Sequence, residues 1–243
     1  MFQKDDKKRY ISILGDGKFH ETVSAGVEDA ILREYETSDG KKGSKWEMVY
    51  SKITANITDV GFYDGDYGMN MQITVEGDEG VAVISIGTET TFGEDFMKKA
   101  PNIDFSKMIT LAPYAFTDDK GRNVRGISLY QDGDKLTNYF WDGEKTANGY
   151  PEPKNREEMT KPKWKIFFLE AREFLIEFTK ENVIPKINKA SNTEKTQALS
   201  QEQKDIEEFD SMPTKQEPPA NLKARLKSKE EIEEGINTDE VPF

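Results

Sequence analysis

The fold prediction depends on the stretch Lys45–Val60, "KWEMVYSKITANITDV". Apolar and polar residues alternate along it, which is the pattern of a long β-strand with one buried face. The side that suits a protein core carries Val49, Ile53, Ala55 and Ile57, together with Glu47 and Ser51. The other side carries Trp46, Met48, Tyr50 and Lys52.

Four further strand-like segments follow this stretch, with a helical segment between the second and the third of them. The strand-like segments are 67–76, 80–87, 107–117 and 123–133. Thr90 or Thr91 is a candidate cap for the helix, which Pro101 would end. Five strands with a helix between the third and the fourth is the order of the OB-fold, a small Greek-key barrel, although other barrels share this order.

Two hairpins are predicted ahead of this barrel and one helix after it. The hairpins turn at Gly15–Gly17 and at 37–44, and whether they join the barrel is left open. A helix is expected over about 155–185, because apolar residues recur at three- and four-residue steps. These residues are Phe167, Phe168, Ala171, Phe174, Leu175 and Phe178. We predict that the helix packs on the barrel; a dimer helix, and with it a homo-oligomer, is the alternative.

The chain changes character after Ile187. Its net charge is −12, and residues 191–243 hold seven bases and thirteen acids, with six acids and no base after Lys229. Such a segment buries too little apolar surface to offset the entropy lost on ordering. The prediction is a mainly β OB-fold domain over 1–187, a disordered linker over 188–235 and an acidic tip over 236–243.

Several kinds of chemistry lack support in the sequence. No cysteine is present, which excludes disulfides and thiolate sites, and the single histidine, His20, has no nucleophile motif beside it. The acids of Asp64–Asp66 and Asp132–Lys135 do not continue into a calcium loop. We therefore predict no catalytic residue, no metal and no cofactor. No apolar run approaches a membrane span, so we expect a soluble, cytoplasmic protein, in the host cytoplasm if the protein is viral.

Aromatic and basic side chains are expected on the open face and beside it. In the strand predicted over 107–117, alternation places Tyr114 and Phe116 on the opposite face from Ile109 and Leu111, unless Pro113 introduces a bulge. The candidate stacking residues are Trp46, Tyr50, Tyr114, Phe116 and Tyr130. The candidate phosphate contacts are Lys41, Lys42, Lys45, Lys52, Arg122 and Arg125. This combination suits single-stranded nucleic acid, because bases stack on the rings for roughly 1–3 kcal/mol each while cations follow the phosphates.

The last five residues combine acids with an aromatic that no core would hold. They are Asp239, Glu240, Val241, Pro242 and Phe243. Proline favours an extended backbone before it, so we expect the phenyl ring and a carboxylate to be presented together to a partner. This ending resembles the acidic tip of bacterial and phage single-stranded DNA-binding proteins, and the predicted order of OB-fold, linker and tip is similar to theirs. The resemblance covers about seven residues and points to a divergent phage-type member. It implies a tip that recruits replication and repair enzymes and, in several members, competes with DNA.

The sequence therefore predicts a non-enzymatic protein that binds single-stranded DNA, independently of sequence, in replication, recombination or repair. The alternative is a protein-interaction adaptor with an OB-like barrel and no DNA binding. A third hypothesis is a magnesium-dependent nuclease that uses Asp64 and Asp66, although neither has a companion motif. RNA in place of DNA stays open, because stacking does not read the 2′-hydroxyl.

Overall fold

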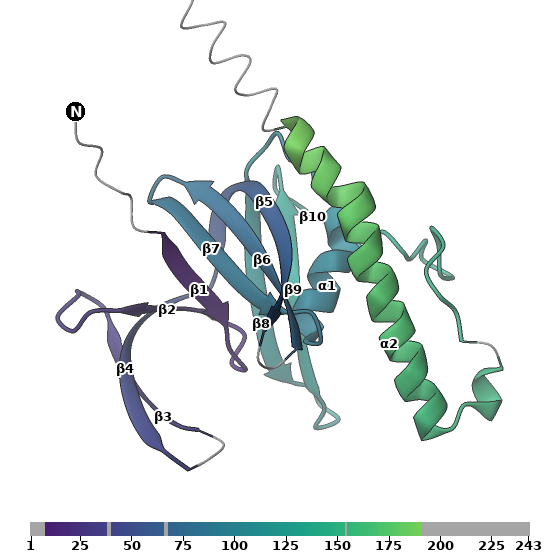
Figure 1. Ribbon diagram of the computed structural model, residues 1–243, viewed down its shortest axis with the longest axis horizontal. Helices are drawn as coiled ribbons and strands as arrows, with labels where there is room; N and C mark the ends of the chain where they lie inside the picture. The colour runs from purple at the N-terminus through teal and green to yellow at the C-terminus, as the bar shows by residue number, and fades with distance from the viewer. Residues whose placement is uncertain (1–7, 38–39, 66–67, 154, 191–243) are drawn as a thin grey trace, which may run out of the picture. The chain divides into compact units, whose positions relative to one another are not determined.

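The computed structural model describes residues 8–37, 40–65, 68–153 and 155–190 of the chain (Figure 1). The strands are β1 (Arg9–Ile13), β2 (Phe19–Val23), β3 (Ile31–Glu36), β4 (Lys42–Tyr50), β5 (Ile53–Gly65), β6 (Gly68–Gly77), β7 (Gly80–Gly87), β8 (Ile109–Thr117), β9 (Asn123–Gln131) and β10 (Asp134–Lys135). The helices are α1 (Thr91–Lys99) and α2 (Lys161–Phe178), with 3-10 turns at Ala100–Asn102 and Arg156–Glu158 and a π-helical turn at Thr179–Val183. The protein is mainly β, as predicted, and α2 follows the strands in the sequence.

The strands form one open sheet in the order β10-β9-β8-β5-β6-β7-β1-β2-β4-β3. Neighbouring strands run antiparallel except β1 and β7, which run parallel. β5 joins the two parts of the sheet, because residues 53–55 pair with β8 and residues 56–65 pair with β6. Both hairpins that precede β5 therefore extend the same sheet, which settles a point that the sequence left open.

The long strand predicted over Lys45–Val60 is in fact two strands. The ladder stops at Ser51 and Lys52, and β4 and β5 take different partners on either side of that break. A shift in register between Ile57 and Asp59 then lets Val60 point inward as well as Ile57. Alternation correctly places Ala55 and Ile57 in the core, but it does not reveal where one strand ends and the next begins.

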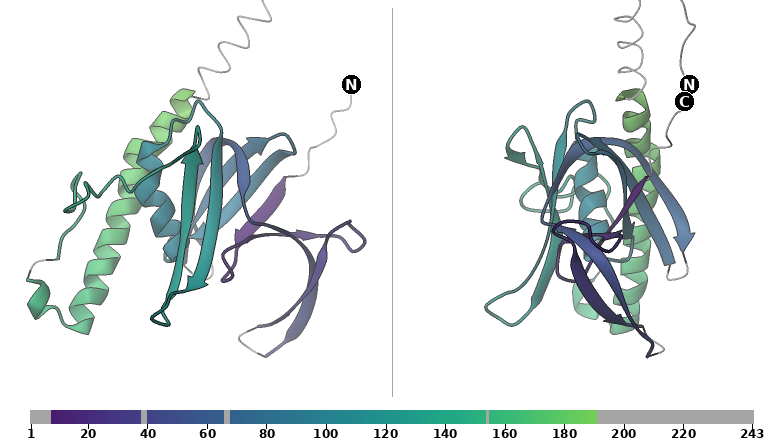
Figure 2. Two further views of the ribbon diagram at one scale, coloured as in Figure 1. Left: turned by 180° about the vertical axis from the view of Figure 1, so that it is seen from behind. Right: turned by 90° about the vertical axis from the view of Figure 1, so that its left-hand side faces the viewer.

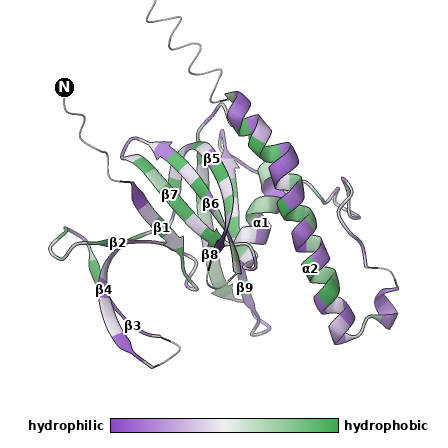
Figure 3. Cartoon of the chain, in the orientation of Figure 1, coloured by the Kyte–Doolittle hydropathy of each residue, from purple (hydrophilic) through white to green (hydrophobic). Residues whose placement is uncertain are grey.

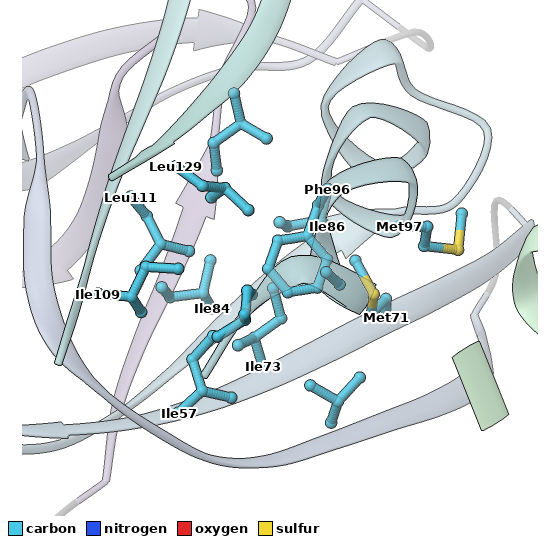
Figure 4. Close-up of a cluster of buried hydrophobic side chains, with 14 of the residues drawn as sticks. Ile57, Met71, Ile73, Ile84, Ile86, Phe96, Met97, Ile109, Leu111 and Leu129 are labelled. Atoms are coloured by element: carbon cyan, nitrogen blue, oxygen red, sulfur yellow. The ribbon is translucent and has the colours of Figure 1, made fainter. Parts of the chain in front are cut away.

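The core is built by the inward side chains of β5 to β9 and by α1 (Figure 4). Alternate residues of each strand are buried, as in Met71, Ile73 and Val75 of β6. Phe96 and Met97 of α1 have no exposed surface. Each of these side chains contributes about 1.5–3 kcal/mol on burial, so this region supplies much of the driving force for folding.

The predicted boundaries of α1 are confirmed. The Thr90 side chain accepts a hydrogen bond from the Gly93 N–H at 3.1 Å, so Thr90 is the N-cap. The helix ends at Lys99, and Pro101 lies in the 3-10 turn that follows. Capping and proline chemistry are local, which is why the sequence indicates both ends of the helix.

The outer edge of β9 is bound by α1 rather than by another strand at Ile127. The Asp95 carboxylate accepts the Ile127 N–H at 2.8 Å, and the Lys99 ammonium donates to the Ile127 carbonyl at 2.7 Å. The two side chains also bond each other at 2.7 Å. Because both polar groups of Ile127 point to α1, the residue opposite it on β8 needs no N–H. That residue is Pro113, and it introduces no bulge.

The C-terminal helix is buried against the body in its second half, while in its first half Trp164 and Phe167 are half-buried and line a pocket with Phe140 and Tyr150. Ala171, Leu175 and Ile176 are buried, and the backbone stays helical through the π-turn to Ala190. Phe174 and Phe178 join an aromatic cluster with Phe140, Tyr139 and Tyr150. In the first half, Phe168 is 53% exposed. The predicted packing of α2 therefore holds from Ala171 onward and not for Phe168.

Residues 188–190, at the start of the predicted linker, are helical, and the rest of the linker and the tip lie outside the described residues. In the part of the chain that the structure describes, no helix has the length and apolar character needed to cross a membrane.

Replacing Asp95 with alanine is expected to lower the free energy of unfolding by about 2–3 kcal/mol, because it leaves the Ile127 N–H without an acceptor and removes the carboxylate that pairs with the Lys99 ammonium. Urea unfolding followed by circular dichroism measures this. Asp134→Ala, at an exposed position of β10, is the matched control and is expected to change stability by less than about 0.5 kcal/mol. Equal effects of the two substitutions would show that the contact at Ile127 is not stabilising.

Candidate functional site

The β3–β4 hairpin and the β8–β9 hairpin extend at the same end of the sheet, with the turn between β1 and β2 lying between them (Figures 1 and 2). Most of the candidate ligand-binding residues belong to these two hairpins. Their surroundings decide which of them are available to a ligand.

The turn after β1 is the predicted "GDG" hairpin turn, closed by hydrogen bonds between Leu14 and both Gly17 and Lys18. Gly17 has a φ of +72°, and a Cβ at this position would overlap the β8 backbone at Tyr114 and Ala115. The turn therefore contacts the part of β8 that extends beyond its pairing with β5, and glycine permits this contact.

A buried carboxylate organises the β2–β4–β3 part of the sheet. Glu47 has no exposed surface. It accepts hydrogen bonds from Arg33 at 2.7 and 3.1 Å, from Lys45 at 2.7 Å and from His20 at 2.9 Å. The other ring nitrogen of His20 lies 3.1 Å from Asp16 in the β1–β2 turn. One connected network therefore links three strands to the turn that contacts β8.

This network fixes the charge of Glu47. Burial raises the pKa of the carboxyl group, but the hydrogen bonds from Arg33, Lys45 and His20 outweigh it and lower the pKa to about 2. The carboxylate is thus ionised at neutral pH although it is buried. The cationic partners of Glu47 are held beside it, so Lys45 is less free to contact a phosphate than the sequence suggested.

An aromatic ring and a cation lie together next to this network. Arg33 pairs across the hairpin with Lys45, and Tyr35 pairs with Gly43. A Cβ at Gly43 would lie 2.7 Å from the Tyr35 ring, so the ring extends over the space that glycine leaves. The Arg33 guanidinium lies 5.8 Å from the centre of that ring, and Tyr35 is 39% exposed. A base could therefore stack beside a cation here.

Trp46 and Tyr50 lie on the opposite face of β4 from Glu47, as the alternation predicts, but the prediction that this is the open face is wrong at Tyr50, which packs against the core, whereas Val49 does not. Tyr50 is half-buried; its hydroxyl accepts from Arg9 at 2.9 Å and donates to Glu21 at 3.0 Å. Burial, and then the bond to Glu21, raise the pKa of Tyr50. The ring borders a pocket of about 210 Å³ that Lys52 also lines. Tyr50 is thus held in a polar cluster, while Lys52 is exposed.

In the β8–β9 hairpin, the aromatic candidates and Arg125 lie on opposite faces. Tyr114 and Phe116 share one face, with their ring centres 6.0 Å apart. Arg125 pairs with Ala115 and so lies on the other face, where Gly15 of the β1–β2 turn approaches it. Burial, with the charge of Asp95, raises the pKa of Tyr114. Phe116 is the more accessible ring, at 56% exposed.

The remaining candidates are dispersed. Arg122 is paired with Asp118 at 2.7 Å, and Tyr130 lies further along β9, opposite Thr110. Lys41 and Lys42 are exposed on the β3–β4 hairpin. In the described parts of the chain, Lys42, Lys52, Lys120 and Arg125 form no ion pair.

The structure thus places the candidates in three settings. Tyr114 and Phe116 lie together, Lys45 joins the Glu47 network, and Trp46 and Tyr50 lie on the opposite face of β4. Sequence analysis missed Arg33 and Tyr35, which become neighbours of Lys45 only through the register of the hairpin. The length of the 37–41 turn is the sequence feature that could have indicated this register.

Among the residues that the structure describes, no group of three or more histidine, aspartate or glutamate side chains could hold a metal ion. Of the two acids in the nuclease hypothesis, Asp64 is exposed at the end of β5 and Asp66 lies outside the described residues. Comparison with known proteins gave no match to a family model, a curated protein or a solved structure.

Replacing Glu47 with glutamine tests the buried network. The folded pKa of about 2 lies below the ordinary value of 4.5, so Glu47 contributes stability above pH 4.5 that is lost as the pH falls toward 2. This difference corresponds to about 3 kcal/mol. We expect Glu47→Gln to unfold more readily at pH 7 and to lose this part of the dependence on pH.

Urea unfolding at a series of pH values between neutral and about pH 3 measures this effect. Glu76→Gln, at an exposed position of β6, is the matched control and should keep the wild-type pH dependence. A Glu47→Gln protein with the wild-type dependence would contradict the assignment.

Proposed function

We propose that this chain is a non-enzymatic protein that binds single-stranded DNA without sequence preference, in replication, recombination or repair. The observation that carries the proposal is the pair of hairpins at one end of the sheet. They present exposed aromatic rings and, at other positions of the same hairpins, cations that form no ion pair within the described residues. Phe116 and Tyr35 supply the rings, and Arg125, Lys42 and Lys120 supply the cations.

Stacking explains why the ligand would be single-stranded. A ring that lies open on a hairpin can stack only on a base that is free of its own helix. Every base has a flat face, so the contact tolerates any sequence. Arg33 would strengthen the binding of a base at Tyr35, because Glu47 holds the Arg33 guanidinium beside the Tyr35 ring.

Charge alone would bind DNA weakly here. Glu34 and Glu36 lie on the same hairpin as Lys42, and Asp118 neutralises Arg122. We therefore assign most of the affinity to stacking and a smaller part to phosphate contacts. This predicts a salt dependence that is clear but less steep than that of a uniformly basic protein.

The arrangement of β5 to β9 supports an OB-like domain within the larger sheet. Its antiparallel pairs are β5–β6, β6–β7, β5–β8 and β8–β9, with α1 between β7 and β8. This is the strand and helix order that the sequence predicted. The edge of β7 pairs with β1, and α1 binds the edge of β9 at Ile127. The proposed domain is therefore an open variant of the barrel.

The acidic ending adds the second half of the proposal. Asp239 to Phe243 resemble the partner-recruiting tip of single-stranded DNA-binding proteins of the divergent phage type. We propose that this segment, which lies outside the described residues, recruits replication or repair enzymes and competes with DNA for the hairpins. The setting would be the cytoplasm, of the host if the protein is viral.

Fluorescence anisotropy of labelled oligothymidine tests the proposal directly, with duplex DNA of equal length and oligouridine in parallel. The full chain should bind the single strand more tightly than the duplex, and the affinity should fall at least about tenfold between about 50 and 200 mM salt. A chain ending at Lys229 loses six acids and should bind more tightly. No binding by either version would reject the DNA proposal in favour of a protein-interaction adaptor, and tighter binding to oligouridine would identify RNA as the ligand.

Single substitutions locate the binding surface. Tyr35→Ala and Phe116→Ala should each weaken binding about 5- to 150-fold, the range expected for one stacked base. Trp141→Ala is the matched control: this ring is 51% exposed, close to the 56% of Phe116, but lies in a segment beside α2. Arg125→Ala should make the slope of log affinity against log salt concentration shallower by about one, which is the contribution of one phosphate contact. Equal losses for Trp141→Ala and Phe116→Ala would move the site away from the hairpins.

A further inference from the structure

A pocket of about 280 Å³ lies between the segment that follows β10 and the first half of α2. Figure 1 shows this segment beside the start of α2, where Figure 3 shows hydrophobic colouring. Among the described residues, the lining consists of six aromatic rings, two prolines, two cations and two uncharged polar side chains, without a carboxylate. The rings are Phe140, Trp141, Tyr150, Trp164, Phe167 and Phe168.

Packing holds the rings on both sides of this pocket. Phe140 is buried, and its ring centre lies 5.5 Å from that of Tyr150. On the side of α2, Trp164 meets Phe167 edge-on at 5.8 Å and stacks on Phe168 at 5.5 Å. A flat aromatic group that enters the pocket would therefore meet aromatic walls, against which offset stacking and edge-to-face contacts are favourable.

A short turn fixes Trp141 at the pocket without burying it. Trp141 and Thr146 form a single β-bridge. Between them, the Asp142 carboxylate accepts the backbone N–H groups of Lys145 at 2.9 Å and Glu144 at 3.0 Å, and these bonds lower the pKa of Asp142. Trp141 is nevertheless 51% exposed, so its indole is held in place with a face available to a ligand.

The uncharged polar groups of the pocket have hydrogen-bonding capacity left over. The side-chain oxygen of Asn138 accepts the Phe140 N–H at 2.9 Å, which orients the amide and leaves its NH2 group as a donor. Within the described residues, neither this NH2 group nor the Thr146 hydroxyl forms a hydrogen bond. An amide and a hydroxyl beside aromatic rings are the groups that enzymes use to hold a single nucleobase outside a helix.

The charged groups of the pocket are both cations. Arg156 is exposed and, in the part of the chain that the structure describes, forms no ion pair. Lys98 lies 3.4 Å from Glu94 and 5.6 Å from the centre of the Tyr150 ring. Acids that are near in the sequence, such as the exposed Glu152, do not line the pocket. The pocket thus favours an anionic group although the net charge of the chain is −12.

We propose that this pocket binds a free nucleotide, with its base between the rings and its phosphates at Arg156 and Lys98. A nucleotide matches the rings and the cations in one molecule, whereas an apolar ligand would leave the cations unused and an inorganic anion the rings. Guanidinium groups bind phosphate through two parallel hydrogen bonds. The volume is close to the lower end of the range for small-molecule sites, roughly 300 Å³, which suits one nucleotide rather than a run of stacked bases. The inference does not rest on the DNA-binding proposal.

Equilibrium dialysis of the full chain against labelled ADP, without DNA, tests this proposal. ADP should occupy one site per chain with a dissociation constant below about 1 mM. Adenosine, which lacks the phosphates, and pyrophosphate, which lacks the base, should each bind at least about tenfold more weakly.

Substitutions place the site in this pocket. Trp141→Ala and Arg156→Ala should each weaken ADP binding at least about fivefold, which for the ring is the lower end of the range for one stacked base. Lys145→Ala is the matched control, because Lys145 is an exposed cation on the same turn as Trp141 that does not line the pocket. Circular dichroism checks that each variant keeps the wild-type fold.

A competition with labelled oligothymidine separates this site from the hairpins. Saturating ADP should leave the affinity for oligothymidine unchanged. The proposal is overturned if ADP does not bind at millimolar concentration, if adenosine or pyrophosphate binds as tightly as ADP, or if both pocket variants bind ADP like the wild type. It is also overturned if oligothymidine displaces ADP, because the pocket would then belong to the DNA-binding surface. A chain that binds ADP but no oligothymidine would reject the DNA proposal and support this one.

Discussion

The sheet depends on β5, because this strand connects its two parts. β8, β9 and β10 join the rest of the sheet through residues 53–55, and the remaining strands join through residues 56–65. The two ladders leave β5 on opposite edges, and the register shift between Ile57 and Asp59 keeps both Ile57 and Val60 in the core. The β8–β9 hairpin and the β3–β4 hairpin are therefore positioned by one strand, which relates the two surfaces proposed to bind DNA.

A buried charge, rather than apolar packing, holds the β3–β4 hairpin. Burying a carboxylate costs several kcal/mol, and only complete hydrogen bonding offsets that cost. Arg33, Lys45 and His20 supply these bonds to Glu47, and His20 extends the network to Asp16. The bonds from Arg33 and Lys45 to Glu47 form in the register that pairs these two residues across the hairpin. The consequence for binding is that Arg33 and Tyr35 are held in one geometry.

The sequence predicts features that depend on neighbouring residues and fails where distant segments decide. The Thr90 cap, the turn at Gly15–Gly17 and the alternation in β8 are local, and each is present. The break at Ser51 arises because β4 and β5 pair with different strands, and no pattern within 45–60 marks it. The sheet is open where a closed barrel was expected, because β1 takes the edge of β7 and α1 binds Ile127 of β9. Of the candidate site, residue types were predictable, but the contacts of Glu47 with His20 and Arg33, which lie 27 and 14 residues away, were not.

The distribution of unpaired charge distinguishes the surfaces of this protein. Around Glu47, cations and carboxylate meet within the chain, so that region has little charge to offer a partner. In the two hairpins the balance is different. Lys42, Lys120 and Arg125 form no ion pair within the described residues, and exposed rings lie on the same hairpins at Tyr35 and Phe116. The charge that the fold does not use internally is therefore found on the hairpins, which is why we assign the proposed binding of DNA to them rather than to the Glu47 network.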